Sequence, residues 1–360
     1  MNVLIRVDSS REIGLGHLKR SMLLASHLKQ NGWNAFFVCR DHDGNLNQLV
    51  IESGFDLYRL QTNTQYTSEN LYERWLGDSP SSDSSDFINI ARNIGSVDLV
   101  IVDHYGIDSA WHNKIKNSLG CKILVIDDLA NRTYDCDILL DQTLGRLSTD
   151  FERLVSRNCI ILAGTSYALI NEIYSVKRMK LEKRDLPKQP RILVSMGGTD
   201  LNNVSEFILD SLVFWSGIKN AIVTVVGMLS EKGEEIFSNL SCVERYHYQY
   251  TERMPELIEN HDLCIGALGS SSWERCCLGL PSIAILTAEN QRSIASALDK
   301  SGAIKYVGEW QSLNRDYLLK TLDLVLKNKE IYEEMSMLAL KVCDGKGLDR
   351  VFTAILNNTK

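Results

Sequence analysis

The sequence predicts an α/β protein built from two Rossmann-like domains that face a cleft. Its 360 residues are about twice the length of an average domain. Short apolar runs alternate with longer amphipathic ones along the chain, which is typical of parallel sheets covered by helices on both faces. The chain begins with a strand that leads into a glycine loop, and the same combination begins again at Arg191, after a charged stretch. Since such folds bind ligands at the carboxyl ends of their strands, we expect the site in the cleft.

Nine strands are predicted, each from a short apolar run. They cover residues 3–7, 35–39, 99–102, 123–126 and 160–162 in the first half, and 192–195, 222–226, 263–265 and 282–286 in the second. Helical periodicity separates them, as in residues 17–31, where Leu18, Met22, Ala25 and Leu28 share one face. The Ser- and Asp-rich residues 76–86 predict an exposed, mobile loop.

The expected domain boundaries are residues 1–170, a linker over 171–190, and a second domain over 191–328. A final helix over about 329–357 is expected to fold back and complete the first domain. The linker carries six basic residues and two of the five prolines. This charge run is typical of a solvated linker, and a basic contact for a phosphate-bearing partner is the alternative.

Composition excludes several classes of function. Lys and Arg number 39 against 46 Asp and Glu, so the net charge is −7 and we expect no nucleic-acid partner. No apolar stretch reaches the roughly 18–20 residues that span a bilayer, and residues 1–8 lack the features of a signal peptide. The nine cysteines form no C-x-x-C pair, which favours free thiols in a reducing compartment. We therefore expect a cytoplasmic protein with no membrane partner.

The first strand leads into a glycine loop and a helix. Asp8 ends the strand, Gly14 and Gly16 follow, and His17 begins the helix, so we expect a ligand here. The dipole of the helix disfavours a cation in its first turn and so favours the neutral imidazole that a general base needs. A capping or merely exposed histidine is the alternative. The third glycine of a dinucleotide fingerprint is absent, so NAD is not expected.

The second half repeats this arrangement twice, with glycines and hydroxyl residues at the end of a strand. These residues are, in chain order, Gly197, Gly198, Thr199, Gly269, Ser270 and Ser271. Their amides and hydroxyls suit a diphosphate, and Glu274, one turn into the following helix, has two oxygens for a ribose diol. N-capping by the serines, and a capping box between Ser271 and Glu274, are the alternatives.

Other polar side chains also follow strands of the first half. Asp103, His104, Asp127 and Asp128 are expected to bind substituents of a substrate, to orient His17, or merely to shape the loops at the strand ends. Residues 41–43 (Asp-His-Asp) mimic the D-x-D motif of metal-dependent sugar transferases. A polar surface loop is the simpler interpretation of that motif, so no metal site is predicted.

Six ordered motifs lie between about residue 1 and residue 300. They are Arg6-x-Asp8-x-Ser10-x-x-Ile13-Gly14-x-Gly16-His17, Val102-Asp103-His104-Tyr105-Gly106, Gly164-x-x-Tyr167-Ala168-Leu169, Met196-Gly197-Gly198-Thr199-Asp200, Ser271-x-x-Glu274 and Asn290-Gln291. Together they resemble the UDP-2,4-diacetamido-2,4,6-trideoxy-beta-L-altropyranose hydrolases of bacterial pseudaminic acid biosynthesis. That family is in turn similar to the GT-B glycosyltransferases, particularly the lipid II-forming UDP-GlcNAc transferase.

The resemblance implies a role for each matched residue. His17 is the general base and Tyr105 lies by the sugar. Glu274 and its loop hold UDP, and Asn290 with Gln291 lines the cleft. No metal and no cofactor are implied. The family tends to have a basic residue at the position of Asn171. Any contact that such a basic residue makes across the domain hinge is therefore not predicted for this chain.

The implied reaction is water attack at the anomeric carbon of a UDP-sugar, with inversion, giving UDP and the free sugar. A GT-B glycosyltransferase, a hydrolysing UDP-sugar 2-epimerase and a non-catalytic nucleotide-sugar sensor share the UDP contacts and stay open as alternatives. The resemblance also implies a preceding N-acetyltransferase, a following sialic-acid-type synthase, and a role in flagellin glycosylation or surface polysaccharide.

Overall fold

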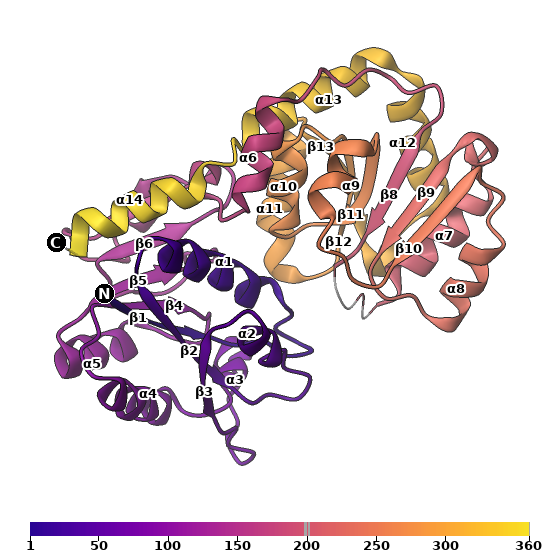
Figure 1. Ribbon diagram of the computed structural model, residues 1–360. Helices are drawn as coiled ribbons and strands as arrows, with labels where there is room; N and C mark the ends of the chain where they lie inside the picture. The colour runs from indigo at the N-terminus through magenta and orange to yellow at the C-terminus, as the bar shows by residue number, and fades with distance from the viewer. Residues whose placement is uncertain (198–199, 201, 360) are drawn as a thin grey trace. The chain divides into compact units, whose positions relative to one another are not determined.

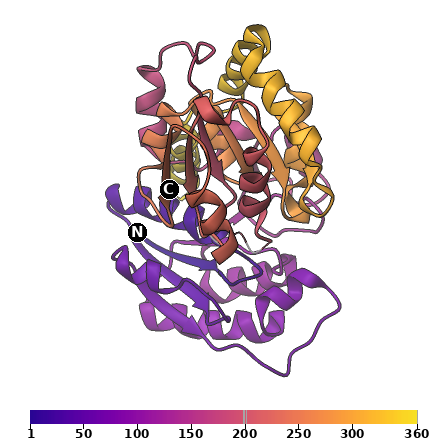
Figure 2. The same cartoon turned by 90° about the vertical axis from the view of Figure 1, so that its right-hand side faces the viewer.

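The chain divides into two compact units. The computed structural model describes residues 1–197, 200 and 202–359. Unit 1 comprises Met1–Leu169 and the chain from Lys346 onwards, and unit 2 comprises Ile170–Gly345. In both units helices cover the two faces of a parallel sheet (Figure 1, Figure 2). The predicted α/β class with two Rossmann-like domains is confirmed.

Unit 1 contains seven parallel strands among the described residues. They are β1 (Asn2–Val7), β2 (Asn34–Arg40), β3 (Asp56–Leu60), β4 (Leu99–Asp103), β5 (Lys122–Ile126), β6 (Ile138–Asp141) and β7 (Ile160–Ala163), and their order in the sheet is β3-β2-β1-β4-β5-β6-β7. The helices are α1 (Gly16–Gln30), α2 (Gln48–Glu52), α3 (Leu71–Leu76), α4 (Pro80–Ile94), α5 (Ser109–Leu119) and α14 (Gly347–Thr359).

The two faces of this sheet follow from the alternation of side chains along each strand. Val3, Ile5 and Val7 of β1 pack with side chains of α1 and α14. Leu4, between them, points to the opposite face and packs with side chains of α4 and α5. Near-continuous apolar strands of this kind are typical of sheets buried on both sides.

Unit 2 contains six parallel strands among the described residues. They are β8 (Arg191–Ser195), β9 (Ile222–Val226), β10 (Glu244–Tyr248), β11 (Leu263–Ala267), β12 (Ser282–Leu286) and β13 (Ile304–Glu309), in the order β10-β9-β8-β11-β12-β13. The helices are α6 (Glu172–Met179), α7 (Val204–Val213), α8 (Glu231–Ser238), α9 (Met254–Asn260), α10 (Ser271–Cys277), α11 (Arg292–Lys300), α12 (Arg315–Lys327) and α13 (Lys329–Val342). Apolar residues of α7 and α12 pack on one face of the sheet, and α9 and α10 lie over the other (Figure 1).

All nine predicted strands are present, and four strands were not predicted. β3, β10 and β13 lie at the edges of the two sheets and carry polar residues, so they lack the apolar runs on which the prediction relied. β6 is a short strand between Asp137 and Gln142. Edge position and shortness both weaken the apolar signal of a strand.

The expected loop over residues 76–86 is wrong. Residues from Pro80 onwards form α4, whose N-cap Ser79 accepts a hydrogen bond from the amide of Ser82, with proline in the first turn. These are helix-start signals, which the Ser-rich composition concealed. Inside the first turn, Asp83 is fully buried and forms ion pairs with Arg6 of β1 and Arg40 of β2, each at 2.7 Å.

The expected final helix over 329–357 is two helices. α13 ends at Val342 and belongs to unit 2, and α14 begins at Gly347 and belongs to unit 1. The first residue of α14 packs against the backbone of Ala168 so closely that only glycine fits there. A Cβ on Gly347 would lie 2.1 Å from the carbonyl oxygen of Ala168. Only the second part therefore completes the first domain.

The expected linker over 171–190 begins with a helix, and its arginines bind carbonyl groups. Arg178 donates to the carbonyls of Cys277, Leu340 and Cys343 at 2.7–3.1 Å. Arg184 donates to the carbonyls of Ile258, His261 and Leu278 at 2.6–3.1 Å. The last carbonyls of α9, α10 and α13 have no hydrogen-bond donor within their own helix, and these two arginines supply the missing donors. Neither residue is a solvated linker charge.

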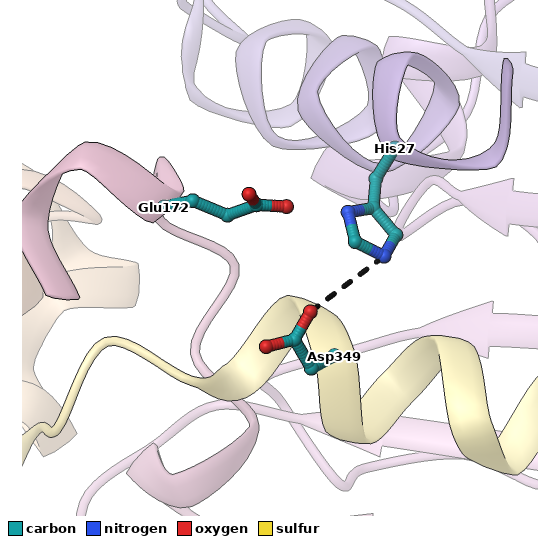
Figure 3. A group of neighbouring side chains, drawn as sticks. All are labelled: His27, Glu172 and Asp349. Atoms are coloured by element: carbon teal, nitrogen blue, oxygen red, sulfur yellow. Dashed lines mark ion pairs between the residues drawn. The ribbon is translucent and has the colours of Figure 1, made fainter. Parts of the chain in front are cut away.

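The last helix is also held to the first. His27 of α1 lies 3.8 Å from Asp349 of α14, as Figure 3 shows, and its ring packs edge-on against Phe352. All nine cysteines are free thiols, as predicted. Among the described residues, no helix combines the length and the apolar character that a membrane span needs.

Candidate active site

Both sheets reverse their strand order at one point, and the candidate residues lie there. In unit 1 the chain runs outward from β1 to β3 and then returns to place β4 on the other side of β1. In unit 2 the same reversal separates β8 from β11. Loops diverge at the carboxyl ends of such strand pairs, and this opening is where ligands bind in open α/β sheets. His17 follows β1, Tyr105 follows β4, and Gly269 follows β11.

The loop after β1 is shaped by its own backbone and one serine. Ser10 Oγ accepts hydrogen bonds from the amides of Glu12 and Ile13, and the Gly14 amide donates to the Ser10 carbonyl at 2.9 Å. Gly14 has φ +77°, a conformation that favours glycine. Gly16 is exposed as the first residue of α1, so His17 occupies the second position of that helix.

His17 is held by a carboxylate at the end of the neighbouring strand. Its Nδ1 lies 2.6 Å from Oδ1 of Asp103, and the residue is 7% exposed. Burial alone would raise the pKa of Asp103, but Arg20 and His17 lower it well below its usual range. An ionised carboxylate only accepts hydrogen bonds, so in the neutral ring Nδ1 carries the proton and Nε2 keeps its lone pair. That arrangement suits a general base.

Tyr105 packs directly against His17. The two rings meet edge to face, with centroids 4.6 Å apart. The hydroxyl of Tyr105 donates to Oδ2 of Asp128 at 3.0 Å. Burial and the charge of Asp128 raise the pKa of Tyr105 well above its usual value, so the phenol is neutral. Tyr72 and Trp75 of α3 pack on the same ring, with centroids 5.3 Å and 6.1 Å away.

Asp8 lies behind the loop that it begins. It is fully buried, accepts from Arg6 at 2.5 Å and from the Arg40 amide at 2.7 Å, and faces His42 and His104 at 3.5 Å and 3.4 Å. Burial alone would raise the pKa of Asp8, but Arg6 lowers it well below its usual range. These contacts hold the strand ends together, so Asp8 supports the loop from inside.

The four polar residues at the ends of β4 and β5 divide into three roles. Asp103 orients His17 and Asp128 holds Tyr105, as described above. Asp127 shapes its own loop, because Oδ1 accepts from the amides of Leu129 and Ala130 and from the Tyr134 hydroxyl. His104 accepts from the Gly106 amide at 3.0 Å, and burial lowers its pKa to about 3, so it is a neutral loop residue.

In unit 2 the glycine motif after β8 is described only in part. Gly197 is exposed with φ +96°, whereas Gly198 and Thr199 lie outside the described residues. Asp200 accepts hydrogen bonds from the amides of Val204 and Ser205 at 2.9 Å and 2.8 Å. The aspartate of this motif therefore caps α7.

The loop after β11 is organised from below by an arginine that the sequence analysis did not single out. Arg275 is 2% exposed and donates to the Ala267 carbonyl at 2.8 Å, to Ser271 Oγ at 3.2 Å and to Ser272 Oγ at 3.1 Å. A serine oxygen that accepts from a guanidinium keeps its own hydrogen for another acceptor. Gly269 is half-buried and Ser270 exposed beside these hydroxyls. The loop thus presents donors, which suits an anion.

Glu274 is held by a tyrosine from α6. Burial raises the pKa of Tyr174 well above its usual value, and a hydrogen bond with Glu274 raises it further. The predicted capping alternative is not supported, because Ser270 is the N-cap of α10 and makes no side-chain capping bond. Tyr174 thus orients Glu274 near the serines.

Two other predicted residues follow β12. Gln291 Oε1 accepts from the amide and the hydroxyl of Thr287, both at 3.1 Å, which closes the turn between them. The side chain of Asn290 lies outside the described residues. Asn171, the departure from the family pattern, is the N-cap of α6 and accepts from the Ile173 amide at 2.9 Å. A lysine or arginine could not accept that bond.

The D-x-D-like residues 41–43 do not gather around a common point. Asp41 accepts from Asn47 at 2.9 Å and from Arg59 at 2.7 Å, whereas the side chain of Asp43 is 88% exposed beside Arg11. Within the part of the chain that the structure describes, neither Asp41 nor Asp43 belongs to a group of three metal-ligating side chains close enough to share an ion.

Arg20, Tyr174 and Arg275 take part in the candidate site and were not predicted. Arg20 stands three residues after His17, a helical spacing that places both on one face, so the sequence held a signal for it. Arg275 stands four residues after Ser271 in α10, so helical spacing held a signal for it as well. Tyr174 acts through Glu274, which is distant in sequence, and no local spacing indicates that contact.

Comparisons with known proteins agree with this architecture. The model of the glycosyltransferase family 28 C-terminal domain matches residues 191–346. Among solved structures, MurG of Acinetobacter baumannii is 14% identical, with a TM-score of 0.68 over 99% of both chains. A UDP-GlcNAc 2-epimerase from Neisseria meningitidis, bound to UDP-GlcNAc, is 14% identical, with a TM-score of 0.61 over 99% of this chain and all of that one. At these identities the likeness shows the fold, which is of the GT-B type.

Sequence similarity is closer to a curated enzyme. The UDP-2,4-diacetamido-2,4,6-trideoxy-beta-L-altropyranose hydrolase of Campylobacter jejuni is 30% identical over 305 residues, which cover 84% of this chain and 97% of that protein. The matched stretch is longer than either unit alone, and the predicted resemblance to this family is confirmed. The chain therefore belongs to the family of this hydrolase.

Proposed function

We propose that this protein hydrolyses UDP-2,4-diacetamido-2,4,6-trideoxy-beta-L-altropyranose to UDP and the free sugar. Water attacks the anomeric carbon from the face opposite UDP and inverts it. The observation that carries the proposal is His17, whose Nδ1 is engaged by Asp103 at 2.6 Å at the strand-order reversal of unit 1. Membership of the hydrolase family supports the choice of substrate.

In this proposal unit 1 supplies the base. Nε2 of His17 takes a proton from the attacking water, and Asp103 stabilises the imidazolium that forms. Tyr105, whose hydroxyl is fixed by Asp128, lies beside the sugar. UDP is a good leaving group, so the reaction needs a base for water more than an acid for the departing oxygen.

Unit 2 holds the nucleotide. The amides of Gly197 and Gly269 and the hydroxyls of Ser270 and Ser271 bind the diphosphate and stabilise its charge as the bond to the sugar breaks. Glu274 accepts hydrogen bonds from the ribose. The Ser271 hydroxyl supports this assignment, because its oxygen accepts from Arg275 and its hydrogen can therefore be donated to a phosphate oxygen. The free acylated sugar is a suitable substrate for a sialic-acid-type synthase.

The reaction can be tested with the UDP-sugar in oxygen-18 water. We expect the label in the anomeric hydroxyl of the sugar and none in UDP. Label in UDP would show attack at phosphorus and contradict the role given to His17. UDP release without any acceptor separates hydrolysis from glycosyl transfer and from sensing. A proton NMR spectrum of the released sugar separates simple hydrolysis from 2-epimerisation.

A further inference from the structure

Arg20 contacts both carboxylates that hold the candidate catalytic side chains. It follows His17 by one turn of α1, and its side chain is 10% exposed. Its Nε and one terminal nitrogen donate to the two oxygens of Asp103, each at 2.7 Å. The other terminal nitrogen donates to Oδ2 of Asp128 at 2.5 Å. This fork is geometry that a guanidinium provides and an ammonium does not.

The contacts of Arg20 close a ring of five side chains. Oδ2 of Asp128 also accepts from the Tyr105 hydroxyl at 3.0 Å, and the Tyr105 ring meets His17 edge to face. His17 in turn contacts Asp103. Arg20 also contacts the base directly, because one of its terminal nitrogens lies 3.2 Å from Nδ1 of His17. The position of His17 relative to Tyr105 is thus set both by direct packing and through Arg20.

The charges of this ring suit a histidine that gains a proton. Two carboxylates and one guanidinium sum to one net negative charge while His17 and Tyr105 are neutral. Arg146, whose guanidinium reaches the Asp128 carbonyl, forms its own pair with Asp141 and adds no net charge. A proton on His17 therefore brings the ring to neutrality, and the buried imidazolium leaves no surplus charge.

We propose that Arg20 is a positioning residue for the reaction. It holds Asp103 and Asp128 at a fixed separation, so that the base and the tyrosine keep the relative position that the reaction requires. A single ion pair with Asp103 would be enough if Arg20 only stabilised unit 1. The additional bond to Asp128 connects Arg20 to Tyr105 as well, because Asp128 also accepts from the Tyr105 hydroxyl. This inference rests on the proposed function, in which His17 is the base.

Two variants of the full chain test this role. Arg20→Ala removes the fork, and Arg20→Lys keeps one charge that cannot reach three carboxylate oxygens at once. We expect kcat for UDP release to fall about 10- to 100-fold in both, as for other residues that orient reacting groups, with KM little changed. Low, non-denaturing guanidinium chloride should restore part of the kcat of Arg20→Ala, with sodium chloride as the salt control.

Arg59→Ala is the matched control, because Arg59 forms a more exposed pair with Asp41 in the same unit. We expect normal kcat from it and no response to guanidinium. Wild-type kcat in folded Arg20→Lys or Arg20→Ala would overturn the role of Arg20, as would a loss of kcat in Arg20→Ala that guanidinium does not relieve. If Arg20→Ala does not fold, the kcat of Arg20→Lys, checked by its melting temperature, decides. An active His17→Asn variant would instead contradict the proposed function itself.

Discussion

Nδ1 of His17 lies 2.6 Å from Oδ1 of Asp103, although 86 residues separate them in the chain. The contact joins the start of α1 to the end of β4, the strand beside β1. Because it engages Nδ1, Nε2 is the ring nitrogen that can accept a proton. A histidine that only capped α1 would not need this partner. The consequence is testable with a single substitution.

His17→Asn keeps much of the size of the side chain but cannot take up a proton at neutral pH. General base catalysis contributes about 10²–10⁴-fold, so turnover should fall by at least that range while UDP affinity stays near wild type. Steady-state kinetics and calorimetry measure the two. His27→Asn, on the same helix, is the control and should keep full turnover. Near-normal turnover of His17→Asn would remove His17 as the base.

Glu274→Ala should weaken UDP binding by about 1.5–3 kcal/mol, because a charged acceptor for the ribose is lost. Calorimetric titration with UDP measures the change. Tyr174→Phe removes the hydroxyl that bonds Glu274 but leaves the carboxylate in place, so it should cost less affinity than Glu274→Ala. Equal UDP affinity in wild type and Glu274→Ala would leave the carboxylate with a purely local role beside Tyr174.

Asp83→Asn tests the buried charge cluster that the sequence concealed. Breaking a buried ion pair typically costs about 3–5 kcal/mol, because its partners stay charged and uncompensated. Asp349→Asn, which removes an exposed carboxylate near His27, should cost less than about 1 kcal/mol. Denaturant unfolding at neutral pH compares the two variants. A loss at Asp83 no larger than that at Asp349 would contradict this account.

The same cluster predicts how stability depends on pH. Burial alone would raise the pKa of Asp83, but Arg6 and Arg40 lower it below its usual value. A carboxyl whose folded pKa is lowered stabilises the protein above its unfolded pKa of about 3.9, and that contribution is lost as the pH falls through the folded pKa. Between pH 5 and pH 2 the unfolding free energy of Asp83→Asn should therefore fall less steeply than that of wild type. Parallel slopes would show that Asp83 is not responsible.

Turnover should survive EDTA. The proposed reaction uses His17 as the base and backbone amides for the diphosphate, and neither role requires a cation. UDP release is measured after dialysis against the chelator, with and without added magnesium. If EDTA abolishes turnover and magnesium restores it, Asp41 and Asp43 become candidate ligands.

Much of the fold could be predicted because buried parallel strands leave a strong signal. Runs such as Val3–Val7 are apolar at every position that a two-faced sheet covers, except Arg6. Arg6 is also where local reasoning stopped, since its partner Asp83 lies 77 residues away in a segment whose composition resembles a loop. Sequence patterns assign a charged residue to the surface, whereas a charged residue that is paired with an opposite charge can be buried in the core.

The candidate site divides in the same way. His17, Gly14 and the serines after β11 stand in local patterns of strand, loop and helix start, so the sequence identifies them. The division of roles among Asp8, Asp103, Asp127 and Asp128 depends on which strand end lies beside which. Sheet order decides that, and the spacing of residues along the chain does not reveal it.

The last helix has a consequence for how the protein is made. Leu348, Val351 and Ile355 of α14 are buried in the core of unit 1 with residues of β1 and α1, the first elements of the chain. A ribosome releases the start of the chain long before its end. The N-terminal unit therefore cannot complete its core during synthesis and waits, with one face of its sheet partly uncovered, until the whole of unit 2 has emerged. Chains truncated before Lys346 should expose that face of the sheet. A bulky tag joined directly to the C-terminal end of α14 should disturb the packing of β1 and α1, at the N-terminal end of the chain.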